Sequence, residues 1–296
     1  MTPPKQASAQ VAGFVFLAIT SIGWGLTWPA TKYLLAEVPP LTLRGSTGVV
    51  GAVILALYAG LRGQSLTVPH RMWPRLLLAA TLNVGAWMTL MGLALVFLPA
   101  SEGALIAYTM PIWAIMFAWP VLGERPTLTR LIALVMAFAG LAAMMGAGGG
   151  GLSGASEKWP GIVMALTGAI SFALGTVFLK KWPIHMPPIP AAAWQVGIGC
   201  IPVTAAGLVL ETTHLSAVTT LGWWLLLYST VGQFCIAYVA WFAALSRLPA
   251  SVAAIGTMAV PVIGVVTSAF ALGEPLGPGQ IAALVFTLGG VALATR

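Results

Sequence analysis

The stretch from Leu98 to Met144 reads LPASEGALIAYTMPIWAIMFAWPVLGERPTLTRLIALVMAFAGLAAM, and a related stretch begins 150 positions later. Residues 248–294 read LPASVAAIGTMAVPVIGVVTSAFALGEPLGPGQIAALVFTLGGVALA, which gives 14 identities in 47 positions without a gap. The shared features include a Leu-Pro-Ala-Ser start, a mid-segment proline (Pro111 and Pro261) and a Leu-Gly-Glu triplet. Alanine-rich sequence inflates identity counts, but proline, glycine and glutamate in register indicate an internal duplication.

The composition is typical of an integral membrane protein. Of the 296 residues, 59% are hydrophobic and 6% are charged, and there is no aspartate. A soluble domain carries about 25% charged residues, so this chain cannot build a water-exposed surface. The net charge is +7, and the basic residues lie singly in short loops. This distribution is typical of residues that set the orientation of a membrane protein and not of a nucleic-acid-binding surface.

Apolar runs of about 20 residues, the length that crosses a bilayer core of roughly 30 Å, predict ten transmembrane helices. Their expected ranges are 11–35, 42–61, 73–96, 100–121, 127–146, 160–180, 189–210, 221–245, 251–271 and 277–295. We expect a first repeat over residues 1–146 and a second over residues 159–296, joined by a Gly/Ser-rich linker at residues 147–158. The first helix is expected to bend or end near Pro29.

The distribution of positive charge predicts the orientation. With the N-terminus in the cytoplasm, ten lysine and arginine residues fall inside, and only Lys32, Arg44 and Lys158 fall outside. This asymmetry satisfies the positive-inside rule, so both termini are expected in the cytoplasm.

Each repeat holds five helices, an odd number, so the second copy must enter the membrane in the opposite sense. The expected fold is therefore all-α, with ten transmembrane helices in two inverted five-helix repeats. Secondary transporters are often built in this way, with the binding site near the membrane midplane between the repeats. A symmetric pair of bundles can open to each side of the membrane alternately.

These features together resemble the EamA branch of the drug/metabolite transporter superfamily. The resemblance rests on the duplication, on the proline in the fourth and ninth helices with Gly-Glu after each, and on Trp24-Gly25 followed by Lys32. Within the superfamily the chain looks most like bacterial YddG-type exporters, which implies export of aromatic and other neutral amino acids across the inner membrane of a bacterial cell. The second repeat departs from the pattern at Phe172-Ala173, where a second Trp-Gly pair would stand.

Glu102 is the ionisable residue that we expect within a helix, close to its outer end. It could complement the positive N-terminus of that helix. Alternatively, it could couple transport to protons or contact a substrate amine, and its repeat equivalent is Val252. Because no other charge is expected at mid-depth, a neutral or zwitterionic, partly apolar solute is favoured over a phosphorylated or cationic one.

The remaining candidates for the cavity lining are aromatic or polar without charge. They are Trp24, Thr27, Trp28, Asn83, Trp87, Tyr108, Thr109, Gln233 and Tyr238. Trp24 and Trp28 are four residues apart and share a helix face, where they could also be ordinary packing residues. Asn83 and its repeat equivalent Gln233 could instead form hydrogen bonds between helices.

Two further groups of residues are tied to the repeat. Pro111 and Pro261 are expected to break their helices, which would free a backbone carbonyl for a solute. Two lysine–glutamate pairs could tie helices laterally, or their members could be four independent snorkelling charges. These pairs are Lys32 with Glu274 on the outer side and Lys180 with Glu124 on the inner side.

Other classes of function are disfavoured. A membrane enzyme needs clustered catalytic groups, but HExxH, CxxC and GxSxG motifs are absent and the three histidines are scattered. No continuous polar lining for a passive channel is visible. We expect no cofactor and no metal; the expected partners are an amino acid-like solute and the lipid bilayer, with the chain as a monomer or homodimer. Another efflux carrier of the same superfamily, for drugs or other metabolites, is the main alternative.

Overall fold

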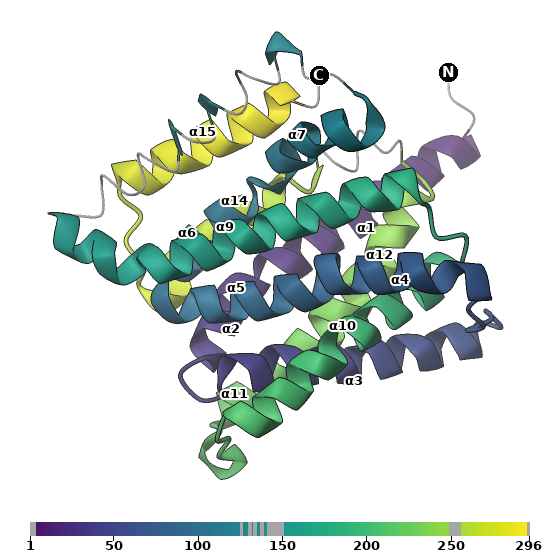
Figure 1. Ribbon diagram of the computed structural model, residues 1–296, viewed down its shortest axis with the longest axis horizontal. Coiled ribbons are helices and arrows are strands. Elements are labelled where there is room, and N and C mark those ends of the chain that lie inside the picture. Colours follow the sequence, from purple (N-terminus) through teal and green to yellow (C-terminus); the bar gives the residue numbers. More distant parts are fainter. Residues whose placement is uncertain are drawn as a thin grey trace.

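The computed structural model describes residues 4–124, 127–129, 132, 135–136, 139–140, 151–248 and 256–294, and every regular element among them is helical (Figure 1). The first part of the chain forms α1 (Pro4–Gly25), α2 (Thr27–Leu34), α3 (Pro40–Leu61), η1 (His70–Met72), α4 (Trp73–Ala79), η2 (Ala80–Gly85), α5 (Ala86–Phe97), α6 (Ala100–Ala107) and α7 (Met110–Leu122). The second part forms α9 (Gly151–Lys181), α10 (Pro188–Leu210), η3 (Leu215–Ala217), α11 (Thr220–Leu227), η4 (Tyr228–Ile236), α12 (Ala237–Leu245), α14 (Ala259–Leu272) and α15 (Pro278–Ala294).

The described residues include seven helical segments that are long and apolar enough to cross a membrane. These are Gln10–Leu34, Pro40–Leu61, His70–Phe97, Ala100–Leu122, Glu157–Lys181, Pro188–Leu210 and Thr220–Leu245, and two shorter apolar helices follow at Ala259–Leu272 and Pro278–Gly290. Large apolar side chains such as Leu61, Val209 and Phe270 are exposed on these helices, which suits a lipid environment. The expected span 127–146 lies largely outside the described residues, so the number of ten spans stays a prediction.

Two of the apolar segments are broken where a proline removes a hydrogen bond. The first stops at Gly25 and resumes at Thr27 because Pro29 has no N–H to donate to the carbonyl of Gly25. The fourth stops at Ala107 and resumes at Met110 because Pro111 has no N–H to donate to the carbonyl of Ala107. In the second repeat, α14 begins only at Ala259, and Pro261 lies in its first turn.

Two π-helical segments, η2 and η4, occupy equivalent positions in the repeats. Residues 80–85 of η2 correspond to residues 230–235 of η4 at the offset of 150. A π-helical turn widens the helix locally and often marks a functional site. Asn83 and Gln233 therefore lie on matching irregularities of the third helix of each repeat.

The two repeats are interlocked by reciprocal helix packing. Helix α1 packs on α12 and α14, and its equivalent α9 packs on α5 and α7, while α3 packs along α10 (Figure 1). Each repeat therefore places its first helix on the third and fourth helices of the other repeat. In this arrangement α2, α6 and α14, which lie beside the helix breaks, pack against one another.

One pair of equivalent contacts accounts for the leucine that opens the Leu-Pro-Ala-Ser motif in both repeats. A Cβ atom added to Gly13 would lie 2.7 Å from Cγ of Leu248, and one added to Gly161 would lie 2.8 Å from Cγ of Leu98. Each leucine that opens the motif thus packs against a glycine of the other repeat's first helix. The space for the leucine exists only because the glycine has no side chain.

The first helix of the second repeat begins earlier than expected. Helix α9 starts at Gly151, whereas the sequence predicted a linker over residues 147–158 and a helix from residue 160. An apolar run marks the part of a helix that lies in lipid, and a helix can extend beyond it. Ala155, Glu157 and Lys158 are good helix formers, so the polar segment before the apolar run continues the helix.

Candidate functional site

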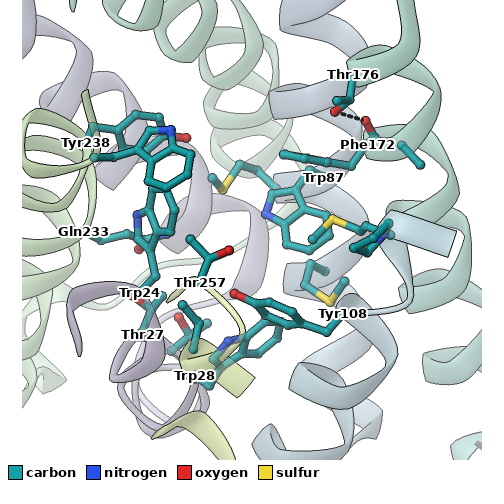
Figure 2. A pocket seen from close by; sticks show the side chains of 18 of the residues that line it. Trp24, Thr27, Trp28, Trp87, Tyr108, Phe172, Thr176, Gln233, Tyr238 and Thr257 are labelled. Atoms are coloured by element: carbon teal, nitrogen blue, oxygen red, sulfur yellow. Dashed lines mark hydrogen bonds between the residues drawn. The ribbon is translucent and has the colours of Figure 1, made fainter. Parts of the chain in front are cut away.

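A cavity of about 470 Å³ is lined by residues from both repeats. Its volume falls within the range of about 300–1,000 Å³ that is usual for small-molecule sites. Seven of the ten predicted cavity residues line it: Trp24, Thr27, Trp28, Trp87, Tyr108, Gln233 and Tyr238. Figure 2 shows these side chains around one space, with Thr257 of the second repeat pointing into it.

Aromatic rings form two opposite walls of this cavity. On one wall the ring of Trp24 meets Tyr238 edge to face, with the centroids 5.5 Å apart, and lies 5.8 Å from Trp241. On the other wall Trp87 of α5 lies 5.3 Å from Phe172 of α9 (Figure 2). Rings held at these distances by their neighbours present flat apolar surfaces to a solute.

Trp28 is held at the end of the cavity by close helix packing. A Cβ atom on Gly264 of α14 would lie 2.9 Å from the Trp28 ring, and one on Gly103 of α6 would lie 3.4 Å from it. The neighbouring Gly25 allows an equally close approach, since its Cβ would lie 2.5 Å from a methyl carbon of Ile263. The Trp24-Gly25 pair therefore combines a cavity residue with a helix-contact residue.

Three of the predicted cavity residues do not line the cavity. Asn83 donates from Nδ2 to Oγ1 of Thr176 at 3.2 Å, so it bridges η2 and α9. Glu102 is buried and pairs with Lys158 of α9 at 2.7 Å. The hydroxyl of Thr109 donates to the carbonyl of Ile106, because the helix break at this point leaves that acceptor within reach.

Unlike its repeat equivalent Asn83, Gln233 lines the cavity. Its side chain is buried in the cavity wall, and its Oε1 atom has no hydrogen-bond partner in the described part of the chain. Thr27, also in the wall, donates to the carbonyl of Gly23 at 3.0 Å. Gln233 therefore provides a free hydrogen-bond acceptor for a bound solute.

The two predicted ties differ in the structure. Lys180 and Glu124 form an ion pair at 2.6 Å, with both side chains partly exposed. Lys32 instead donates to the carbonyl of Leu95 at 2.6 Å, and Glu274 accepts from the backbone N–H groups of Ala100 and Ser101 at 2.6 and 2.9 Å. The two side chains therefore do not pair directly in this conformation, because Lys32 is bound to the carbonyl of Leu95 and Glu274 to the free N–H groups at the N-terminus of α6.

Glu274 is one of three glutamates that join the repeats at helix N-termini. We call Glu37, Glu211 and Glu274 the outer glutamates, since the predicted orientation places all three on the outer side. Glu211 accepts from the N–H groups of Leu41 and Thr42 at 2.9 and 2.8 Å. Glu37 of the first repeat accepts from the hydroxyl of Thr219 in the second at 2.6 Å.

Arg44 is the residue whose position in the structure differs most from the prediction. It was counted among the charges on the outer side and was not expected in the cavity, but it is buried and lines the cavity. Helix α3 begins at Pro40, so Arg44 lies one turn inside it, and its chain runs across Gly92, where a Cβ would lie 2.8 Å from Cγ of Arg44. The sequence signal for this placement is that residue 44 already falls within the expected span 42–61.

The cavity contains other residues that the sequence analysis missed. They are Thr31, Met88, Met91, Leu95, Met110, Ala114, Phe172, Ala173, Thr176, Trp241, Thr257 and Val260. Most are apolar residues in apolar segments, and sequence alone does not separate such residues into cavity, core and lipid faces. Among the described residues, no group of three metal-ligating side chains comes together.

Comparisons with known proteins agree with this architecture. The model of the EamA-like transporter family matches residues 11–146 and 159–296. An uncharacterized transporter, YvbV of Bacillus subtilis, is 31% identical over 279 residues, which are 94% of this chain and 90% of the relative. The aromatic amino acid exporter YddG of Ancylobacter novellus is 26% identical over 98% of both chains. A probable amino-acid metabolite efflux pump of Salmonella typhimurium is 27% identical over 94% of this chain and 93% of the relative.

A solved crystal structure has the same fold. It superposes with a TM-score of 0.68 at 22% identity, over 97% of this chain and 96% of the other. The family model covers both repeats, and the relatives are named as transporters or exporters. The chain is a multi-pass membrane transporter and belongs to the EamA-like transporter family.

Proposed function

We propose that this protein exports small neutral or zwitterionic, partly apolar solutes, in particular aromatic and other hydrophobic amino acids, across the bacterial inner membrane. The observation that carries the proposal is the cavity of about 470 Å³ between aromatic walls that both repeats contribute. The names of two relatives, an aromatic amino acid exporter and a probable amino-acid metabolite efflux pump, support the same solute class.

Alternating access accounts for the arrangement of the two repeats around this cavity. The outer glutamates each bind a helix N-terminus of the opposite repeat, so they hold the outer ends of the repeats together. Release of these contacts would let the outer ends separate, and the interrupted helices beside the cavity would act as hinges. Both termini lie in the cytoplasm in this proposal.

Counterflow in proteoliposomes tests the proposal. Vesicles preloaded with unlabelled phenylalanine should accumulate labelled phenylalanine, and methionine and threonine should compete. The variant Ala114→Trp, which fills the cavity, should abolish counterflow, whereas Val209→Trp on the exposed face of α10 should not. Failure of phenylalanine, methionine and threonine alike to compete would refute the amino acid proposal. Accumulation of a drug or another metabolite instead would favour the alternative efflux carrier.

A further inference from the structure

The wall of the cavity contains a buried cation. Only 6% of the Arg44 surface is exposed, and the residue lines the cavity. Its Nε atom has no hydrogen-bond partner, and its Nη1 atom donates to the hydroxyl of Thr31 over 3.4 Å, a long contact. Most of the hydrogen-bonding capacity of this guanidinium is therefore unused.

No glutamate neutralises this charge in the described structure. The chain has six acidic residues, and all of them lie in its described part: Glu37, Glu102, Glu124, Glu157, Glu211 and Glu274. Glu102 and Glu124 pair with lysines, and the outer glutamates are bound to helix N-termini. Glu157 is exposed near the start of α9. None of the hydrogen bonds or ion pairs found among the described residues joins a carboxylate to Arg44.

A buried charge without a partner is unfavourable, so its presence requires a physical reason. The aliphatic part of Arg44 packs over Gly92, and the residue lines the cavity. A guanidinium presents a planar fork of N–H donors that matches the two oxygens of a carboxylate. A solute that carries a carboxylate would satisfy the group that the protein leaves unsatisfied.

The rest of the cavity complements such a solute. The Oε1 atom of Gln233 is an unused acceptor that suits an ammonium group, and the aromatic walls suit an apolar side chain. We propose that Arg44 binds the carboxylate of the transported solute and that the protein therefore selects solutes with a carboxylate over those without one. The proposal rests on the solute class proposed above and adds the group by which the solute is recognised.

Three ligands of similar size test in the wild-type protein whether binding depends on the carboxylate of the solute. These are phenylalanine, phenylethylamine, which lacks the carboxylate, and 3-phenylpropionate, which lacks the ammonium. Binding is measured by quenching of the cavity tryptophans in detergent, and competition by counterflow in proteoliposomes. Phenylethylamine should bind at least about tenfold more weakly than phenylalanine, because the charge-assisted hydrogen bonds to Arg44 are lost.

Variants then assign the effect to Arg44. Arg44→Gln should lose the preference for phenylalanine over phenylethylamine, and Arg44→Lys should keep part of it. Arg62→Gln, on an exposed residue at the far end of α3, serves as the control and should leave the preference unchanged. Thermal unfolding of each variant shows whether it is folded, and the ligand series in the wild type does not depend on the variants.

The outcomes separate this proposal from the proposed function. If phenylethylamine binds as well as phenylalanine, or if Arg44→Gln keeps the preference, the role of Arg44 is refuted while amino acid transport can stand. If 3-phenylpropionate binds through Arg44 but no amino acid is transported, the role of Arg44 stands and amino acid export is refuted. If none of the carboxylates binds the wild-type protein, both proposals are refuted.

Discussion

The substitution Glu274→Gln should weaken the contact that holds the outer ends of the repeats together. The carboxylate of Glu274 accepts from the N–H groups of Ala100 and Ser101 and from the hydroxyl of Ser101 at 2.6, 2.9 and 2.5 Å. Helix α6 has no side-chain cap of its own, since Pro99 precedes it. Glu274 therefore supplies both the acceptors and the negative charge that the helix N-terminus favours.

The size of the effect follows from these three hydrogen bonds. Hydrogen bonds to a charged group contribute about 1.5–3 kcal/mol each, but bonds that share one carboxylate are not additive. Glutamine keeps one acceptor oxygen and loses the charge, so we expect a loss of about 2 kcal/mol. Since the partners belong to opposite repeats, this loss shifts the equilibrium toward separated outer ends by about 30-fold.

Hydrogen exchange measured by mass spectrometry in nanodiscs tests this expectation. Peptides that contain the start of α6 should exchange about 30-fold faster in the variant, and peptides of α10 should not change. The control is Glu124→Gln, the equivalent position in the first repeat, whose ion pair with Lys180 is partly exposed and contributes about 0–1 kcal/mol. Equal effects of the two substitutions, or unchanged exchange at α6 in Glu274→Gln, would refute the idea that Glu274 joins the repeats.

Two further predictions concern packing and the cavity. Gly161→Val should destabilise the protein by about 1–3 kcal/mol because its side chain would overlap Leu98, and thermal unfolding should show this loss. Gly60→Val is the control, since a Cβ atom there meets no atom within 4 Å, and an equal loss in both would contradict the packing argument. Gln233→Ala should raise the apparent KM for phenylalanine by about tenfold, corresponding to one lost hydrogen bond, while Asn83→Ala should change it by less than about twofold. Equal KM changes in proteoliposome transport would show that both residues act through helix packing.

The sequence predicted best those features that depend on local signals. Proline removes an N–H at a known position, so helix interruptions near Pro29 and Pro111 could be anticipated. The Trp24 and Trp28 pair follows from helical spacing, and both residues line the cavity. The packing of Leu98 against Gly161 was not predicted, although each of these residues is identical to its repeat equivalent, Leu248 and Gly13 respectively.

Features that depend on distant partners could not be read from the sequence in the same way. The burial of Arg44 depends on Gly92, 48 positions along the chain, which provides the room for its side chain. Glu274 was expected to pair with Lys32, but it binds α6, whose free N–H groups carry no sequence signal of their own. Glu102 was a cavity candidate because an intramembrane carboxylate is costly, and the structure offsets that cost with Lys158 instead.

The differences between the repeats follow from the solute that the cavity is proposed to bind. The prolines that precede α3 and α10, Pro39 and Pro187, are 148 positions apart, so Arg44 corresponds to residue 192, a buried alanine. A second arginine there would be another buried charge without a partner, at a cost of several kcal/mol. An amino acid has no two-fold symmetry and presents its carboxylate once, so one anchor is enough. Contacts that form the frame, such as Gly13 with Leu248, are therefore duplicated, while Arg44, which we propose binds the carboxylate of the solute, occurs in one repeat only.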